Sequence, residues 1–144
     1  RPATAPNGKP WPTRTGYVPG YPRMFANGRC VVVVDNSQNN SDVFVRLMSL
    51  DAPRLAIRQF FIESGGQFRV TGVRRGRYDI RYRDLDSGAL TKSEGFALEE
   101  TKVETGGTEY TEMTLTLYKV KGGNMHTEAI GEDEFLDSAS GELE

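Results

Sequence analysis

The stretch GQFRVTGVRRGRYDIRYRD, residues 66–84, decides the predicted fold. Apolar and polar side chains alternate in both of its halves, a pattern typical of strands with one face in water and the other in a core. The apolar positions are Phe68, Val70, Tyr78, Ile80 and Tyr82. Gly76 lies between the halves and can adopt the positive φ that a tight reversal needs. We therefore predict a β-hairpin, with both strands in one layer and the rest of the chain covering its apolar side.

Five further segments predict strands, which makes seven in all. Each is short, apolar or alternating, and bounded by turn-forming residues. The segments are residues 29–35, 43–48, 56–62, 90–98 and 113–120. Because no amphipathic helix separates them, the sequence predicts an all-β fold, a seven-stranded antiparallel β-sandwich over residues 29–121. A chain of 144 residues has room for one such domain with a buried core.

Cys30 opens the valine run 31–34, which predicts a strand buried on both faces. It is the only cysteine, so it cannot form an intramolecular disulfide. Apart from Arg29 no neighbour favours a thiolate, and a buried structural role is therefore favoured over a reactive thiol.

Residues 1–28 contain six of the seven prolines and are expected to form an extended arm or linker. The arm also carries large aromatic residues, which a purely flexible spacer does not need. Two interpretations of Trp11, Tyr17 and Tyr21 stay open. Either the rings pack on the sandwich and hold the arm as a strap over a sheet edge, or they form a surface for sugar stacking or partner binding.

Charge is divided between the two ends of the chain. No acidic residue precedes Asp35, whereas seven acidic residues and no basic residue follow from Thr127 onward. We predict that residues 122–144 form an acidic tail with one helical turn around 132–136 and disorder beyond it. The net charge of only −2 argues against a nucleic-acid partner.

No segment approaches the roughly 18 apolar residues of a membrane span, and no signal-peptide core is present. The chain begins at Arg1. We therefore expect a processed form or a piece of a longer protein.

Residues 66–80 resemble the signature hairpin of carboxypeptidase-regulatory-like, or transthyretin-like, β-sandwich domains. In that family an aromatic strand, a tight glycine turn and a Tyr-x-Ile or Tyr-x-Leu strand recur together. The resemblance implies a non-catalytic spacer or interaction module of a bacterial envelope or secreted protein. The expected location is extracytoplasmic, whether periplasmic, at the cell surface, secreted or on a membrane-anchored parent protein.

Four arginines point away from the apolar side of the predicted hairpin and are expected to share one surface: Arg69, Arg77, Arg81 and Arg83. Arginine at each position favours bidentate pairing with carboxylates or phosphates. In one alternative they pair with Glu94, Glu99 or Glu112 in cross-strand ladders. In the other they form a basic sheet face that binds an anionic partner, or the acidic tail of a neighbouring copy.

The sequence offers no catalytic constellation. The only histidine, His126, lies beyond the last predicted strand, so no nucleophile–base triad can be assembled. Phosphate-binding glycine loops, serine-hydrolase elbows and His/Cys zinc clusters are absent. Asp84-x-Asp86-x-Gly88 has the spacing of the start of a calcium loop but lacks the remaining ligands, so a plain turn is favoured over a metal site. We expect no cofactor.

These observations predict a non-catalytic interaction or accessory module with a protein partner. Binding of an anionic partner by the arginine face is the first hypothesis. Carbohydrate or cell-wall binding through the N-terminal aromatic residues is the second. Self-association, through a strand edge or through tail-to-sheet charge pairing, is the third.

Overall fold

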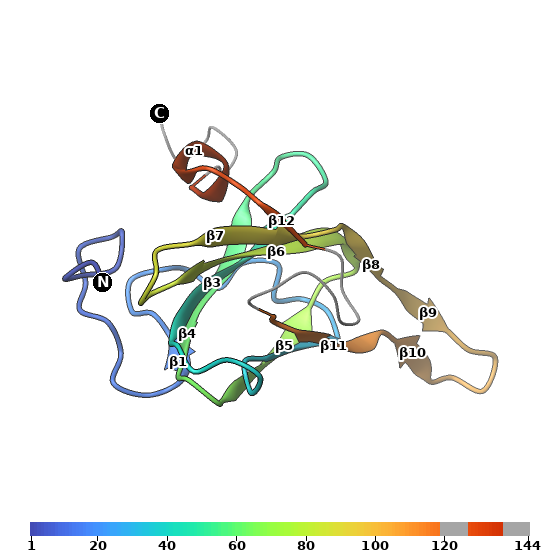
Figure 1. Cartoon of the computed structure of the whole chain (residues 1–144). Helices are drawn as coiled ribbons and strands as arrows, with labels where there is room; N and C mark the ends of the chain where they lie inside the picture. The colour runs from blue at the N-terminus through green and yellow to red at the C-terminus, as the bar shows by residue number, and fades with distance from the viewer. Residues whose placement is uncertain (119–126, 137–144) are drawn as a thin grey trace.

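The computed structural model describes residues 1–118 and 127–136, and their regular structure is almost entirely β. Two sheets face each other, and a smaller strand pair projects beyond them (Figure 1). The large sheet has the order β1 (Gly16–Tyr17), β4 (Ala56–Ile62), β3 (Val43–Ser49), β6 (Gly76–Asp84), β7 (Leu90–Ser93), β12 (Thr127–Ala129), with β8 (Phe96–Leu98) also beside β6. The small sheet has the order β11 (Glu112–Thr116), β2 (Cys30–Asp35), β5 (Gln67–Val73). The remaining elements are the pair β9 (Glu100–Lys102) and β10 (Thr108–Tyr110), and the helical turn α1 (Glu132–Phe135). The predicted all-β, sandwich-like fold is confirmed.

The main core lies between the two sheets. From the large sheet, Tyr78, Ile80 and Tyr82 of β6 point into it; from the small sheet, Val32 and Val34 of β2 do so. Burial of each such valine or isoleucine side chain contributes roughly 1.5–3 kcal/mol. The alternation in the sequence therefore identified the core side of β6 correctly.

The valine run is nearly buried on both faces, because only Val33 is half-exposed to solvent. Cys30 is fully buried, as the sequence predicts, and burial raises the pKa of its thiol. Its Sγ contacts the carbonyl oxygen of Glu99 at 3.5 Å. Cys30 is therefore a core residue of the small sheet.

The predicted hairpin is wrong. β5 pairs with β2 in the small sheet, whereas β6 pairs with β3, β7 and β8 in the large sheet. The chain crosses between the layers at Arg74, whose N–H donates to the carbonyl of Phe25 in the arm. Phe68 and Tyr78 therefore face the same core from opposite layers. Alternation shows which side of a strand is wet but not which strand is its neighbour, and a short turn with glycine allows a crossing as well as a hairpin.

Four other details differ from the prediction. The strand expected at 90–98 is split into β7 and β8, because the Ser93 hydroxyl accepts the N–H of Ile80 at 3.0 Å where a backbone pair would continue. The last predicted strand ends at Thr116. In addition, β11 pairs with β2 in parallel and not antiparallel orientation. The short strands β1, β9, β10 and β12 were not predicted.

The N-terminal arm packs on the sandwich as a strap. β1 pairs with β4, and further along the arm the N–H groups of Val18 and Met24 donate to carbonyls of β4. The Tyr17 ring lies 5.0 Å from that of Phe68 and 6.3 Å from that of Phe60, so it closes the side between the two layers. The strap interpretation is confirmed, and the arm shields an edge that would otherwise be open for pairing.

The N-terminal arm and residues 130–135 cover the outer face of the large sheet. The apolar cluster on this face comprises Ala5, Val18, Phe44, Phe61, Leu85, Leu90 and Phe135, with Trp11, Tyr21 and Ile130 packed at its margin. The helical turn predicted at 132–136 is therefore present as α1, and it is docked on the body. The predicted disorder beyond it, and His126, lie outside the described residues.

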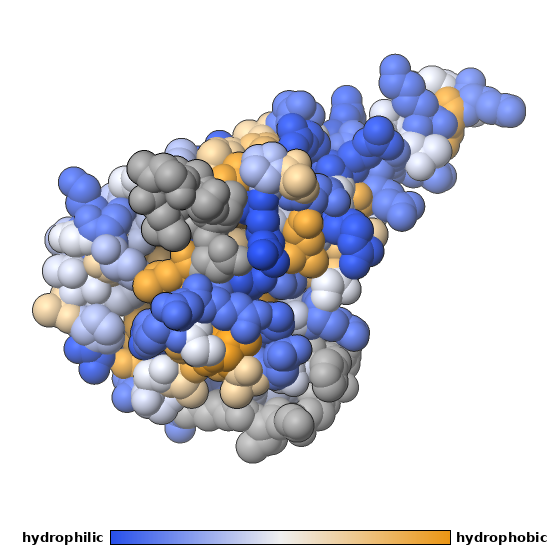
Figure 2. Space-filling model, turned by 90° about the horizontal axis from the view of Figure 1, so that it is seen from above, coloured by the Kyte–Doolittle hydropathy of each residue, from blue (hydrophilic) through white to orange (hydrophobic). Residues whose placement is uncertain are grey.

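The strand pair β9–β10 extends away from the body (Figure 1). In Figure 2, which looks onto the face that carries α1, the projecting β9–β10 pair is mainly hydrophilic. Among the residues described, α1 is the one helix, and its four residues are far too few to cross a bilayer.

Candidate functional site

A row of basic side chains crosses the outer face of the large sheet. Arg46 of β3 lies directly opposite Arg81 of β6, and Arg81 lies opposite Lys92 of β7. Like charges directly opposite each other on neighbouring strands are destabilising unless anions lie among them. Arg83 adds a fourth cation on the same side of β6, two residues along. We call these four residues the basic row.

Within the sheet, Asp79 is the main counter-charge of the basic row. Its carboxylate accepts hydrogen bonds from Arg81 Nε at 3.1 Å and Nη2 at 3.2 Å, and both side chains are almost fully buried. Burial raises the pKa of Asp79, and the hydrogen bonds from Arg81 oppose that rise. Arg46 Nε donates to Gln59 Oε1 at 3.0 Å. Asp79 therefore pairs with Arg81 within the sheet.

The C-terminal segment 127–136 supplies further acceptors. Arg46 Nη1 donates to the carbonyl of Phe135 at 2.5 Å, and Arg81 Nη1 donates to that of Glu134 at 2.6 Å. These carbonyls lie at the C-terminal end of α1, where the helix dipole favours cations. α1 has no basic residue in its last turn, so the sheet provides the positive charge.

Two carboxylates of α1 complete the contact. Glu132 accepts from Arg83 Nη2 at 2.5 Å, and Glu134 pairs with Lys92 Nζ. Exposed ion pairs of this kind contribute at most about 1 kcal/mol each, so they orient the segment more than they hold it.

Phe135 provides most of the apolar contact of the segment. Its side chain is fully buried, and its ring lies 5.9 Å from that of Phe44. The guanidinium groups of Arg46 and Arg83 lie 5.8 and 5.5 Å from the Phe135 ring centre, within the range of cation–π attraction. The outer face therefore holds the chain's own Phe135, which follows Glu132 and Glu134 in the sequence.

The four arginines of the sequence prediction do not share one surface, and this expectation is corrected. Arg69 lies on β5 of the small sheet and forms a bidentate pair with Glu112 at 2.9 and 3.3 Å, as the ladder alternative predicts. Arg77, Arg81 and Arg83 do lie on the same side of β6, but Arg81 is only 1 % exposed. Arginine on the outer side of β6 therefore partly serves the docking of the chain's own segment.

Sequence reasoning missed Arg46 and Lys92. Both lie in segments predicted as strands, but their alignment with Arg81 depends on strand order, which periodicity does not give. The acidic tail did signal a counterpart for the arginines. Residues 127–136 of this tail dock on their own chain, whereas the sequence analysis considered pairing with the tail of a neighbouring copy as one alternative.

Trp11, Tyr17 and Tyr21 do not form one aromatic platform. Trp11 and Tyr21 pack on Phe44 of the outer face, at 5.3 and 6.1 Å, whereas Tyr17 packs at the side of the main core. The indole N–H of Trp11 donates to the carbonyl of Pro2. All three rings are half-buried.

The Asp84–Gly88 segment forms a turn that Asp84 caps. Its Oδ1 accepts the N–H groups of Asp86 at 2.9 Å and Ser87 at 3.0 Å. Asp86 also lies 3.5 Å from the guanidinium of Arg1. In residues 1–118 and 127–136 no group of three potential metal-ligating side chains comes together.

The chain has no match among known protein families, curated proteins or solved structures. The resemblance to transthyretin-like domains therefore stays a prediction. The hairpin on which it was based is absent, because β5 and β6 lie in different sheets.

Acidification is expected to weaken the docking of α1. The hydrogen bond from Lys92 lowers the pKa of Glu134, so the docked state favours the ionised carboxylate. Its contribution is fully present above the ordinary glutamate pKa of about 4.3 and is lost as pH falls through the lowered, folded-state pKa. Amide NMR shifts of residues 132–136 should move between about pH 5 and pH 3.

A Glu134→Gln variant is the matched control for this titration. It keeps an acceptor for Lys92 but cannot titrate, so its α1 shifts should respond less to pH. Identical titration curves for the variant and the wild-type chain would contradict the role of Glu134.

Proposed function

We propose that this protein is a non-catalytic interaction module that binds an acidic, phenylalanine-containing segment of a protein partner on the outer face of its large sheet. The observation that carries the proposal is the basic row, with Arg46, Arg81 and Lys92 aligned on three neighbouring strands and occupied by the chain's own Glu-Asp-Glu-Phe sequence.

Three features of the site support recognition of such a segment. The row concentrates positive charge where one buried carboxylate is its main balance within the sheet. Phe44 and the surrounding apolar cluster receive a buried aromatic ring. Arg46 and Arg81 donate to backbone carbonyls, which a bound peptide of any sequence also has. A partner segment with the same chemistry would compete with residues 127–136.

Competition lowers the apparent affinity of the wild-type chain for a peptide. A ligand that binds only the vacant site loses affinity in proportion to the vacant fraction. Weakening the chain's own segment should therefore tighten peptide binding without any change in the basic row.

The test uses the full chain with Phe135→Ala and a fluorescent peptide of residues 127–136, TEAIGEDEFL. The variant should bind the peptide at least about tenfold more tightly than the wild-type chain does. Adding Lys92→Met to the variant should weaken binding, because the row loses a cation. Arg69→Met, on the small sheet, is the matched control and should leave binding unchanged.

Two results would contradict the proposed function. One is the absence of saturable binding to the Phe135→Ala chain. The other is equal binding of a peptide whose phenylalanine is replaced by alanine, which would show that charge alone attracts it.

Self-association is the second candidate, because a neighbouring copy carries the same C-terminal segment. Exchange of segments between copies would give a dimer whose mass, measured by light scattering, falls at 0.5 M salt as the exposed ion pairs are screened. Carbohydrate binding is less favoured, since Trp11, Tyr17 and Tyr21 pack on the body at two separate places.

The extracytoplasmic location stays a hypothesis drawn from the resemblance. Fractionation of the full-length protein tests it, and a wholly cytosolic protein would exclude it.

A further inference from the structure

The interior between the two sheets holds a buried arginine, Arg58 of β4. It lies two residues before Phe60 and therefore points to the same side of the strand, towards the small sheet. Its Nη2 donates a long hydrogen bond of 3.5 Å to the carbonyl of Thr71, in β5. The residue is only 2 % exposed, and neither Nε nor Nη1 has an acceptor in the described part of the chain. Two of the three guanidinium nitrogens are therefore buried without a hydrogen bond.

Within residues 1–118 and 127–136, no carboxylate balances the charge of Arg58. The ionisable groups that act on its guanidinium are the side chains of Tyr17, Tyr78 and Arg23. Tyrosine is uncharged at pH 7, and the second arginine repels the first. Burial lowers the pKa of Arg58, yet a guanidinium group keeps its proton in a protein. Because an unpaired buried charge is strongly unfavourable, Arg58 needs a counter-ion from outside this part of the chain.

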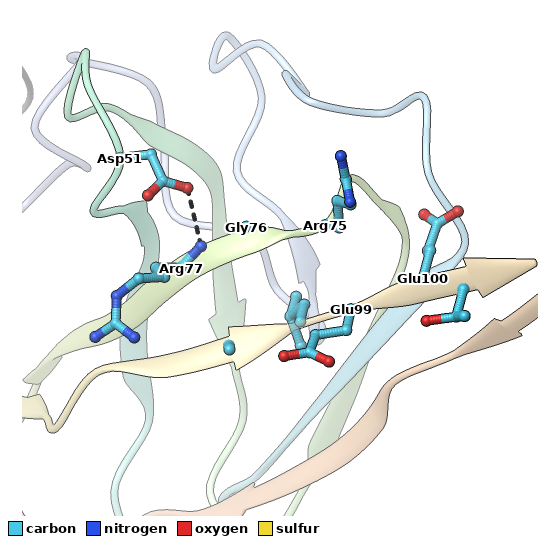
Figure 3. Close-up of a pocket in the computed structure, with 9 residues that line it drawn as sticks. Asp51, Arg75, Gly76, Arg77, Glu99 and Glu100 are labelled. Carbon is cyan, nitrogen blue, oxygen red and sulfur yellow. Dashed lines mark hydrogen bonds between the residues drawn. The ribbon is translucent and has the colours of Figure 1, made fainter.

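Three other arginines show why Arg58 is unusual. Arg75 and Arg77 line an open pocket of about 440 Å³ at the start of β6, where their exposed side chains point apart from each other (Figure 3). Water can therefore solvate both guanidinium groups. Arg81 is as deeply buried as Arg58, but it pairs with the carboxylate of Asp79. Arg58 thus combines the burial of Arg81 with the lack of any carboxylate partner in the described residues.

The N-terminal arm is fixed to β4 on both sides of Arg58. Val18 and Met24 each donate their N–H, at 3.1 Å, to a carbonyl of β4, one from the residue after Arg58 and one from the residue before it. Residues 19–23, between these two bonds, are mainly exposed. A segment with few buried contacts can open locally while the core stays folded. The arm therefore separates Arg58 from solvent at a place where brief opening would admit an ion.

We propose that Arg58 binds a small monovalent inorganic anion, such as chloride, where the arm crosses β4. A peptide or nucleic acid cannot reach Nε and Nη1 while the arm is in place, whereas an ion can enter during a local opening. Arg23 adds positive charge nearby, with its guanidinium 4.0 Å from the ring centre of Tyr17. The site lies on the core side of β4, so it is independent of the basic row on the outer face.

The experiment is an NMR titration of the isotope-labelled full chain. Sodium gluconate, whose anion is bulky, is replaced by sodium chloride at a constant ionic strength of about 0.15 M, so that screening of exposed charges stays the same. The Nε–H signal of Arg58, identified by its absence from the spectrum of Arg58→Met, should shift and saturate. A site with a dissociation constant of about 10 mM would be about nine-tenths filled at about 100 mM chloride.

Thermal unfolding of variants locates the binding. Chloride should raise the Tm of the wild-type chain, because a ligand that binds only the folded state stabilises it. The Tm of Arg58→Met should not respond to chloride. In gluconate this variant should be at least as stable as the wild-type chain, because it lacks the unpaired charge.

Two exposed arginines of the arm provide a matched pair of variants that leave the core intact. Arg23→Gln should raise the dissociation constant for chloride about two- to fivefold, as expected for the loss of one exposed charge near the ion. Arg14→Gln changes the net charge equally and should titrate like the wild-type chain.

Three results would overturn the proposal. The first is no saturable shift of the Arg58 Nε–H signal at about 100 mM chloride. The second is an equal dependence of Tm on chloride in Arg58→Met and in the wild-type chain. The third is identical chloride titrations of Arg23→Gln and Arg14→Gln. None of these results bears on peptide binding at the basic row, so the two proposals fail separately.

Discussion

Arg81→Met is expected to destabilise the protein by about 3–5 kcal/mol at neutral pH, because it leaves the carboxylate of Asp79 buried without its cation. The side chains of Arg81 and Asp79 are 2 % and 5 % exposed, so water cannot replace the lost partner. Urea denaturation monitored by circular dichroism measures the change.

The loss should shrink as pH falls. Burial already raises the pKa of Asp79, and removal of Arg81 raises it further. A carboxyl group whose folded-state pKa is raised costs stability once it ionises. That cost is complete above the folded-state pKa, decreases as pH falls below it, and is gone below the ordinary aspartate pKa of about 3.9. The free energies of unfolding of the Arg81→Met variant and of the wild-type chain should therefore differ less at pH 4 than at pH 7.

A double variant provides the matched control. Arg81→Met with Asp79→Leu replaces the buried pair by apolar side chains and should lie within about 1–2 kcal/mol of the wild-type chain. A single variant that loses less than about 1 kcal/mol, or a double variant no more stable than the single one, would contradict the account of a buried pair.

Phe135→Ala should detach the C-terminal segment from the sheet. Removing a fully buried phenylalanine costs about 3–5 kcal/mol in a core, but here the loss is limited to the free energy with which the segment docks. α1 has four residues and cannot persist alone in water. Hydrogen exchange should therefore show loss of amide protection in residues 127–136 while the strands of the main core keep theirs.

Leu136→Ala is the control for this variant. Leu136 is adjacent in sequence but 40 % exposed, and its loss should change stability by no more than about 0.5 kcal/mol. If Phe135→Ala lowered protection uniformly over β2, β3 and β6, then the segment would be an integral part of the cooperative core and not a docked peptide.

The core residues of this fold could be predicted from the sequence, and the neighbours of its strands could not. Tyr78, Ile80 and Tyr82 face the core because a strand places every second side chain on one side. Cys30 is buried because it begins an apolar run. The same local rule left open whether β5 pairs with β6. Apolar and polar side chains alternate in the same way whether the two strands form a hairpin or lie in different sheets.

The sequence predicted the residue types of the candidate site but not how they are arranged. The sequence shows arginines on the outer side of β6 and an acidic end with Phe135. It gives no sign that Arg46 and Lys92 align with Arg81, because that alignment requires the order β3, β6, β7 and its register. Tyr17 likewise has the same local sequence whether it lies in a free arm or in a strap.

The sequence by itself determined the all-β class, the core-facing side of β6, and the opposite charges of the two ends. These properties depend on neighbours within a few residues, where the geometry of an extended chain is fixed. Tertiary structure alone decided the crossing between layers after β5, the basic row and the docking of the acidic segment on its own chain. Those features bring together residues tens of positions apart, and only the packing of two sheets around a shared core selects among the pairings that the chain allows.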